Sequence, residues 1–361
     1  MNLSAFTNTK LRAIAEKVLD GTPASADDAR TMLATNDILE LGLIANHVRR
    51  ALHGDRVYYG VNMNLNYSNV CELRCPLCAF SRDACDPDAY TFSLEEIEQR
   101  VRDAVAFGID EVHIVGGINP ELGLDYFFEM LRRIKRVKSE LFIVAFTAVE
   151  YDRFAKLGGM SLDELFKKFI DAGLGAIPGG GAEIFDEGVR TVLAPKKISG
   201  DRWLAVMRAA HRAGLRTNAT MLYGHIEDAG HLVDHMSLIR DLQNETGGFK
   251  TFVPLAFHEE HTKVRAKKTV TGFDDLRVYA AARVFLHNVP HMKALWMYVG
   301  EKMAQVLLSF GVDDIGATYH YEKVVHAAGA RTPDAGTEEG LRRLISSAGF
   351  VPVRSTAGYG A

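Results

Sequence analysis

Short apolar runs alternate with longer amphipathic stretches along most of this chain. Runs such as EVHIV from Glu111 and LFIVAF from Leu141 have the composition of buried parallel strands. Helical patterns separate them, for example SLEEIEQRVRDAVAFG, with Ser93 as its predicted N-cap and Gly108 as its stop. Regular alternation of strand and helix indicates repeated βα units, which belong to the α/β class of folds.

Eight runs are strand candidates, and eight βα units predict a closed (βα)8 barrel of the TIM type. An open barrel of six units is the alternative, because the last two runs have the weakest strand pattern. The runs are VYYGVNMN from Val57, EVHIV from Glu111, LFIVAF from Leu141, LGAIP from Leu174, RTNATMLY from Arg216, KTFVPLAF from Lys250, HMKALWMYV from His291 and VDDIG from Val312.

The first 55 residues lack this alternation and have helical patterns instead. A capping box is predicted from Ser25 to Asp28, and apolar residues recur at helical spacing after Ile38. We therefore expect an N-terminal helical segment over residues 1–55. A single barrel domain with a C-terminal helical region is expected over residues 56–361.

The charge balance limits the kinds of partner. The chain has 42 basic and 46 acidic residues and a net charge of -4, without the basic excess that nucleic acid or an anionic membrane surface attracts. No apolar run approaches the roughly 20 residues that cross a bilayer. The first residues also lack a signal-peptide pattern. We expect a cytoplasmic protein that acts on a small molecule, with no nucleic acid and no membrane as partner.

All four cysteines lie in one short segment, which excludes a distributed disulfide framework. Cys71, Cys75 and Cys78 have C-x3-C-x2-C spacing on the loop after the first predicted strand. Three thiolates can hold a 4Fe-4S cluster and leave one iron open to a non-protein ligand. Structural zinc is the alternative, with Cys85 or His113 as fourth ligand. Zinc sites of this kind usually have two separated C-x2-C pairs, so the spacing favours the cluster.

This cysteine spacing after the first strand of a barrel resembles the radical S-adenosylmethionine (SAM) superfamily. The resemblance implies that SAM binds the open iron and that an electron from the cluster splits SAM into methionine and a 5'-deoxyadenosyl radical. It also implies an electron donor such as flavodoxin or ferredoxin. Many members have an aromatic residue before the third cysteine, where this chain has Leu77, so a contact near the adenine differs.

Six longer stretches carry a more specific likeness: HIVGGINPEL from His113, FTAVEYDRFAKLGGMSLDEL from Phe146, GLGAIPGGGAEIFDEGVR from Gly173, TNATMLYGHIED from Thr217, TGGFKTFVPLAFHEEHT from Thr246 and YEKVVHAAGARTP from Tyr321. They resemble the aminofutalosine synthase family of menaquinone biosynthesis. The resemblance implies addition of the adenosyl radical to the enol ether of 3-[(1-carboxyvinyl)oxy]benzoate. Rearrangement and decarboxylation then give aminofutalosine, with methionine and bicarbonate released, so SAM is a co-substrate.

Other functions stay open beside this one. Two sister families share the cysteine spacing and barrel plan: dehypoxanthine futalosine cyclase and the tyrosine-using subunit of deazaflavin (FO) synthase. The FTAVE, PLAFH and PGGGAE segments favour the aminofutalosine synthase family over both. A zinc-dependent barrel hydrolase would need more carboxylate ligands at strand ends than the sequence offers. An electron carrier would normally hold its cluster with four cysteines.

Several candidate site residues follow predicted strands, where the catalytic groups of a barrel gather. The superfamily resemblance places Gly116 and Gly117 at the amino group of SAM, and a tight βα turn is the alternative. Glu183, next to three glycines, could accept hydrogen bonds from ribose hydroxyls. Its alternative is a surface carboxylate near the start of a helix.

Two histidine segments complete the candidate site. His225 and Glu227 alternate on an extended segment, so their side chains should point the same way and could bind SAM or move a proton. A structural hydrogen bond is the alternative. His258 is interpreted as a substrate-pocket residue, because FHEEH lacks the H-E-x-x-H spacing of a zinc helix. The predicted catalytic residues are Glu183, His225 and His258, and the predicted SAM-binding residues are Gly116, Gly117, Glu183 and Glu227.

Overall fold

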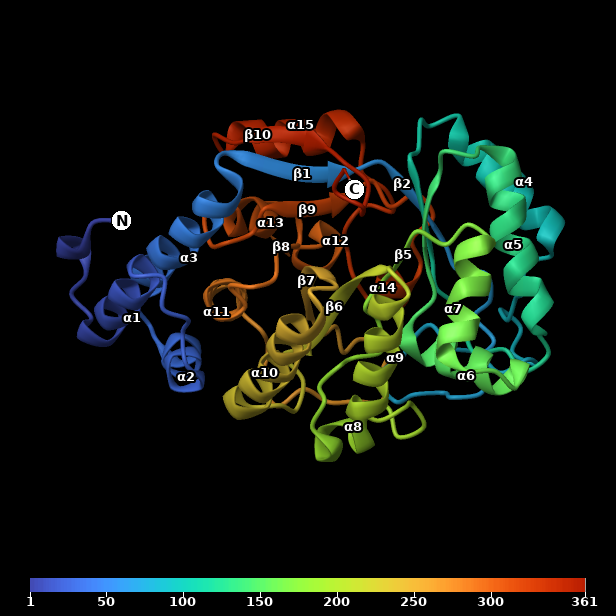
Figure 1. Cartoon of the computed structure of the whole chain (residues 1–361), viewed down its shortest axis with the longest axis horizontal. Helices are drawn as coiled ribbons and strands as arrows, with labels where there is room; N and C mark the ends of the chain where they lie inside the picture. Colours follow the sequence, from blue (N-terminus) through green and yellow to red (C-terminus); the bar gives the residue numbers. More distant parts are fainter. Residues whose placement is uncertain (361) are drawn as a thin grey trace.

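The computed structural model describes residues 1–360. The chain begins with a 3-10 turn, η1 (Leu3–Ala5), and three helices, α1 (Thr9–Leu19), α2 (Ala26–Ala34) and α3 (Ile38–His53). These helices lie at one end of the molecule (Figure 1), where α2 and α3 pack against α11 (Gly272–Phe285). The division into this helical segment and one barrel domain stays a prediction.

Seven parallel strands form the main sheet, in chain order from β2 to β8. A second sheet of three parallel strands has the order β10-β1-β9. The main-sheet strands are β2 (Asn62–Leu65), β3 (Glu111–Ile114), β4 (Phe142–Ala145), β5 (Ala176–Ile177), β6 (Arg216–Tyr223), β7 (Phe249–Ala256) and β8 (His291–Met292), and the others are β1 (Arg56–Gly60), β9 (Asp314–Ala317) and β10 (Val351–Arg354).

Isolated parallel bridges join the two sheets on both sides. Lys293, just after β8, bridges Asp314 in β9, and His320 bridges Met63 in β2. The amide of Asn64 donates to the carbonyl of His320 at 2.7 Å. The parallel order therefore continues from β8 through β9 back to β2. The α/β fold of the TIM-barrel type predicted from the sequence is confirmed.

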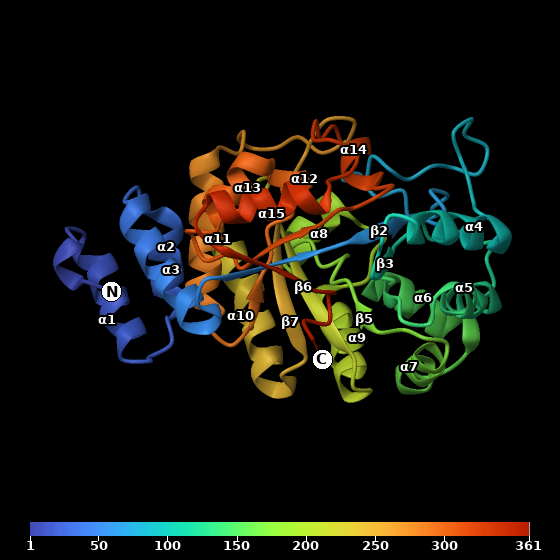
Figure 2. The ribbon, with the colours of Figure 1, turned by 90° about the horizontal axis from the view of Figure 1, so that it is seen from above.

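Helices cover the outside of the strands (Figure 2). Local sequence signals begin several of them: Ser93 is the N-cap of α4, as predicted, and accepts from the amide of Glu96 while Glu96 bonds back to Ser93 in a capping box. None of the helices within residues 1–360 combines the length and apolar composition needed to cross a membrane. The further helices are α4 (Leu94–Val105), α5 (Leu124–Val137), α6 (Ala148–Gly158), α7 (Leu162–Asp171), α8 (Glu187–Leu193), α9 (Gly200–Arg212), α10 (Ala229–Thr246), α12 (Trp296–Val299), α13 (Glu301–Leu307), α14 (Val324–Ala327) and α15 (Glu338–Ser347).

Three strand predictions differ from the structure. The run from Val57 is two strands, because the chain passes from one sheet to the other after Gly60. Only the start of the run from His291 is a strand, and its remainder forms α12, whose Trp296 is buried and donates its indole N–H to a β9 carbonyl at 2.8 Å. Strand β10 was missed because it is a half-exposed edge strand that contains a proline.

Candidate active site

The three predicted cluster ligands lie on the loop between β2 and α4. Cys75 is buried, Cys71 and Cys78 are partly exposed, and all three are free thiols. A bond from the amide of Cys78 to the carbonyl of Cys75, at 2.9 Å, folds the loop locally. Burial raises the pKa of Cys75 to about 11, whereas the ammonium of Lys197 opposes this shift.

This donor set fits a 4Fe-4S cluster with one open iron. The cluster has thiolate ligands, and three cysteines on one loop supply three of the four positions. Cys85 lies on the same segment but is exposed. Cys78 also lines the cavity described below, so the loop that would hold the cluster borders that cavity.

The predicted SAM-contact glycines follow β3 and support the cysteine loop. A methyl group on Gly117 would lie 2.2 Å from the carbonyl oxygen of Val70, and one on Gly116 would lie 2.6 Å from the ring of Tyr67. Val70 immediately precedes Cys71, so only a residue without a side chain allows the two backbones to approach this closely. The contact of these glycines with SAM stays a prediction.

Glu150 connects the same region; the sequence places it after the third predicted strand but assigns it no role in the site. Its carboxylate accepts from the hydroxyl of Tyr67 at 2.9 Å and from the amide of Thr147 at 2.7 Å. Tyr67 also donates to the carbonyl of Gly117 at 3.1 Å. Burial raises the pKa of Glu150 to about 7, and these hydrogen bonds oppose the shift. The glycine turn, the cysteine loop and the start of α6 are thereby connected.

Replacing Gly117 with alanine should disturb the cysteine loop. The added methyl group meets backbone atoms of Val70, which cannot rotate away, and such overpacking costs about 1–3 kcal/mol. We expect a lower free energy of unfolding and less iron retained after anaerobic reconstitution. Gly123→Ala is the matched control, because a methyl group there meets nothing within 4 Å. Equal iron content in the two variants would contradict this role of Gly117.

A cavity of about 340 Å³ extends from the cysteine loop into the barrel. Cys78 and Phe80 line it on the side of the loop, and Val144 and Val253 line it inside the barrel. Ala357, in the C-terminal segment 355–360, also borders it, so this segment closes the far end. The mostly apolar walls with a few polar groups are typical of a small-molecule site.

Glu183 lines this cavity and forms an ion pair with Lys197. The two side chains are largely buried, and Lys197 Nζ lies 2.5 Å from Glu183 Oε1. Burial alone would raise the pKa of Glu183, but the ammonium of Lys197 outweighs it and the pKa is lowered. Glu183 also has a positive φ of 47°, a strained backbone conformation of the kind that concentrates at functional sites.

His258 lines the same cavity, as the sequence interpretation placed it. Its Nε2 lies 3.0 Å from the carbonyl oxygen of Tyr298, and burial lowers its pKa. One ring nitrogen is therefore held by the backbone. The role of His258 in catalysis stays a prediction.

His225 and Glu227 lie in the turn after β6 and are not among the residues that line the cavity. Nε2 of His225 lies 3.0 Å from the carbonyl of Leu222, and Nδ1 lies 2.9 Å from the carboxylate of Glu227. Glu227 also accepts from the amide of Gly224 at 2.6 Å. Burial alone would raise the pKa of Glu227. The contacts with His225 and with the amide of Gly224 outweigh it and lower the pKa to about 2. The segment is a bend and not the extended stretch that the sequence predicts, but the two side chains contact each other, and these contacts fix the turn.

The sequence did not predict the polar residues at the deep end of the cavity, which is the end inside the barrel away from the cysteine loop. His113 was suggested from the sequence only as a zinc ligand. Glu111 and His113 of β3, Asn218 of β6 and Lys293 after β8 all line the cavity. The available signal was alternation: Glu111 and His113 are two residues apart in a strand and so point to one face. A single polar residue inside an apolar strand run is therefore a sequence signal for a side chain that points into the barrel.

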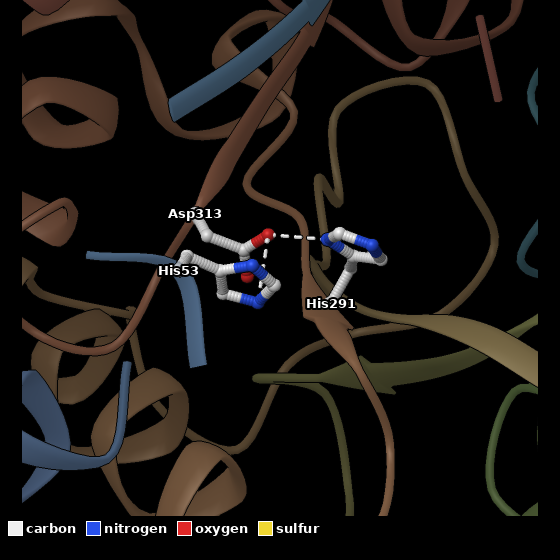
Figure 3. Close-up of side chains that lie close together, drawn as sticks. All are labelled: His53, His291 and Asp313. Atoms are coloured by element: carbon white, nitrogen blue, oxygen red, sulfur yellow. Dashed lines mark hydrogen bonds and ion pairs between the residues drawn. The ribbon is translucent and has the colours of Figure 1, made fainter. Parts of the chain in front are cut away.

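A further cluster of ionisable side chains lies at the opposite ends of the strands. His53, His291 and Asp313 have ligand atoms within 4.8 Å of one another (Figure 3). Asp313 accepts from Nδ1 of His291 at 2.6 Å and lies 3.5 Å from Nε2 of His53. The charges of Arg49 and Arg283 also act on this carboxylate. Because the three groups satisfy one another beside two guanidinium groups, we interpret the cluster as a structural link between α3, β8 and β9.

Comparison with known proteins agrees with the barrel fold and the cysteine loop described above. Residues 65–239 match the radical SAM superfamily, and residues 246–361 match the CofH/MqnC C-terminal region. The aminodeoxyfutalosine synthase of Thermus thermophilus is 39% identical over 361 residues, which cover 99% of this chain and 97% of the relative. The 5-amino-6-(D-ribitylamino)uracil--L-tyrosine 4-hydroxyphenyl transferase of Archaeoglobus fulgidus is 38% identical, over 89% of this chain and 94% of the relative.

Solved structures support the fold. The [FeFe]-hydrogenase maturase HydG superposes with a TM-score of 0.77 at 18% identity, covering 99% of this chain and 78% of HydG. Methylornithine synthase (PylB) gives a TM-score of 0.76 at 18% identity, covering 94% of this chain and 97% of PylB. The sequence matches confirm the family resemblance predicted from the motifs, and they argue against the zinc-hydrolase alternative. The chain belongs to the radical SAM superfamily, as an enzyme that uses a 4Fe-4S cluster and SAM and that has aminodeoxyfutalosine synthases among its relatives.

Proposed function

We propose that this enzyme joins the 5'-deoxyadenosyl group of SAM to 3-[(1-carboxyvinyl)oxy]benzoate and forms aminofutalosine (aminodeoxyfutalosine), with methionine and bicarbonate released. The observation that carries the proposal is the near full-length match to two aminodeoxyfutalosine synthases, at 39% and 37% identity. A cavity that begins at Cys78 and can enclose an aromatic substrate supports it. An electron donor such as flavodoxin or ferredoxin is part of the proposal.

Cys71, Cys75 and Cys78 would hold the cluster, which when bound supplies the electron that splits SAM. The chain's own residues have positioning tasks. Glu183, held by Lys197, would accept hydrogen bonds from the ribose of SAM at the cavity wall. The apolar walls would exclude water from the reacting groups, which limits side reactions of a radical. Gly116 and Gly117 would contact the amino group of SAM.

Product analysis tests the proposal directly. The protein is reconstituted with iron and sulfide without oxygen and given SAM, a reductant and 3-[(1-carboxyvinyl)oxy]benzoate. Mass spectrometry should detect aminofutalosine and methionine in equal amounts. If 5'-deoxyadenosine and methionine form without aminofutalosine, this enzyme shares the superfamily chemistry but acts on another substrate.

A second candidate is transfer of the 4-hydroxyphenyl group of L-tyrosine to 5-amino-6-(D-ribitylamino)uracil. The observation that favours it is the 38% identity with the A. fulgidus transferase, close to the 39% identity with the synthase. The same reconstituted enzyme, given L-tyrosine and the uracil in place of the benzoate, separates the two reactions by the mass of the product.

A further inference from the structure

The deep end of the cavity has an unusual arrangement around Lys250. Thr217 pairs with Phe249, but the next residue of β6, Asn218, pairs with Thr251, so Lys250 is an extra residue in β7. Such a bulge redirects a side chain. Lys250 is buried, and its ammonium donates to Oδ1 of Asn218 at 2.7 Å. Burying a lysine side chain costs free energy of folding, and lysines are rarely buried without a partner, so this position indicates a functional role.

The bond from Lys250 orients the amide of Asn218. Since Oδ1 of Asn218 accepts from the ammonium, its Nδ2 remains available as a donor, and Asn218 lines the cavity. Within residues 1–360, Nδ2 of Asn218 and both ring nitrogens of His113 have no hydrogen-bond partner. These polar groups face one space with unused hydrogen-bonding capacity, which is costly unless a ligand meets it.

Lys293 supplies a cation to the same space. Its Nζ lies 3.2 Å from Asp314 and the side chain lines the cavity. An ammonium has three donors, so this contact leaves others for a ligand. Asp314 is further occupied by the amide of Gly316 at 2.6 Å and the hydroxyl of Tyr359 at 2.5 Å.

The second acid, Glu111, is also partly occupied, because it accepts from the amide of Ala357 at 2.6 Å. Both acids therefore have partners in β9 or the C-terminal segment 355–360. The donors of His113, Asn218 and Lys293 therefore remain for a ligand at this end of the cavity, beside the carboxylate of Glu111.

We propose that Lys293, His113 and the amide N–H of Asn218 form a carboxylate-binding subsite at the deep end of the cavity, which holds the aryl carboxylate of the substrate. Lys250 is the positioning residue that holds Asn218. The identity of the aryl carboxylate rests on the proposed function. Held here, the aromatic ring extends toward the cysteine loop, so the enol ether is the part of the substrate that faces SAM.

This subsite should bind anions better at lower pH. Burial lowers the pKa of Lys250 to about 7, and Lys293 adds to the shift while Glu111 and Asp314 oppose it. The ring of Tyr359 also faces Lys250, at 5.9 Å. Burial, together with Lys293 and Lys250, lowers the pKa of His113 to about 4, so His113 stays neutral from pH 6 to 8. Below pH 7 Lys250 is charged and favours an anion, whereas above pH 7 it loses its proton. The Kd for a carboxylate should therefore rise as the pH increases from 6 to 8, by several-fold.

A pair of small ligands tests the subsite. Kd is measured by calorimetry with the reconstituted holoenzyme and SAM, without reductant, for 3-methoxybenzoate and its neutral analogue 3-methoxybenzamide. Loss of a charged hydrogen-bond partner weakens binding by roughly 10- to 100-fold. We expect the wild-type protein to prefer the carboxylate by about this factor. Lys293→Met and Lys250→Met should lose most of the preference. Lys135→Met, which removes a lysine bonded to two carbonyls on the outer helix α5, should retain it.

The outcomes separate the subsite from the reaction. If the wild-type protein binds both ligands equally, or if both variants keep the preference, the subsite is refuted even when aminofutalosine is formed. If the preference depends on Lys293 and Lys250 but no aminofutalosine appears, the subsite stands and the proposed reaction fails. Should a variant not fold, the wild-type ligand pair measured from pH 6 to 8 decides alone: a preference for the carboxylate that falls with pH supports the subsite, and no preference refutes it.

Discussion

Cys75→Ala protein should retain almost no iron after anaerobic reconstitution and should form no product from SAM. Three thiolates are the whole protein ligand set, and the loss of one leaves two irons of the cubane without a protein ligand. Cys75 is also the buried one of the three, whereas the remaining thiol of the segment, Cys85, is exposed. The measurements are the iron and sulfide content, the absorbance of the cluster, and methionine released from SAM. Cys71→Ala and Cys78→Ala should behave in the same way.

Cys85→Ala is the matched control for this experiment. Cys85 is an exposed thiol on the same segment, so its removal should leave the iron content and the activity at the wild-type level. An active Cys75→Ala protein would refute the cluster assignment. Equal loss of iron in Cys85→Ala would instead point to a fourth protein ligand and a closed metal site.

Asp313→Asn should lower the free energy of unfolding by about 3–5 kcal/mol, because it leaves buried cations without their counter-charge. Asp313 is fully buried and accepts from Nδ1 of His291 and from the amide of Met292, at 2.6 and 2.7 Å. Arg49 and Arg283 are buried close enough to feel its charge, and desolvation lowers the pKa of each to about 10. Urea unfolding followed by circular dichroism measures the difference.

The control is Asp163→Asn, which removes the same charge from the surface. Asp163 and Arg212 form an ion pair of 2.9 Å in which both side chains are 55% exposed. Such pairs contribute about 0–1 kcal/mol, so this variant should stay close to wild type. If both variants lost the same stability, the cluster of His53, His291 and Asp313 would not be the structural link that we infer.

Local signals carried most of the sequence prediction. Most strand runs and the N-cap Ser93 of α4 depend on neighbours in the chain, and these were identified correctly, whereas the runs from Val57 and His291 were only partly correct. The three cysteines could be predicted as cluster ligands because a cluster loop needs only their spacing, and that role stays a prediction. Glu183 and His258 could be placed in the pocket because each follows a strand, and parallel strands bring their carboxyl ends together.

What the sequence could not predict depends on contacts between distant segments. Lys250 is one residue in an apolar run until β6 is laid beside it, and only that pairing reveals the bulge. His53, His291 and Asp313 come from three separate parts of the chain. The split of the run from Val57 depends on strands β9 and β10, whose positions no pattern near Val57 encodes.

Strand β1 lies between β9 and β10, and most of the chain separates β1 from these partners in sequence. Strands that are far apart in sequence lose loop-closure entropy when they pair, before any contact compensates this loss. Such pairing slows folding. We therefore expect this sheet to form late, after the central βα units. Interactions formed after the transition state mainly control how fast a protein unfolds. The small sheet should therefore control the rate of unfolding. Substitutions that remove packing contacts of Tyr58 or its neighbours should increase the unfolding rate and leave the refolding rate nearly unchanged.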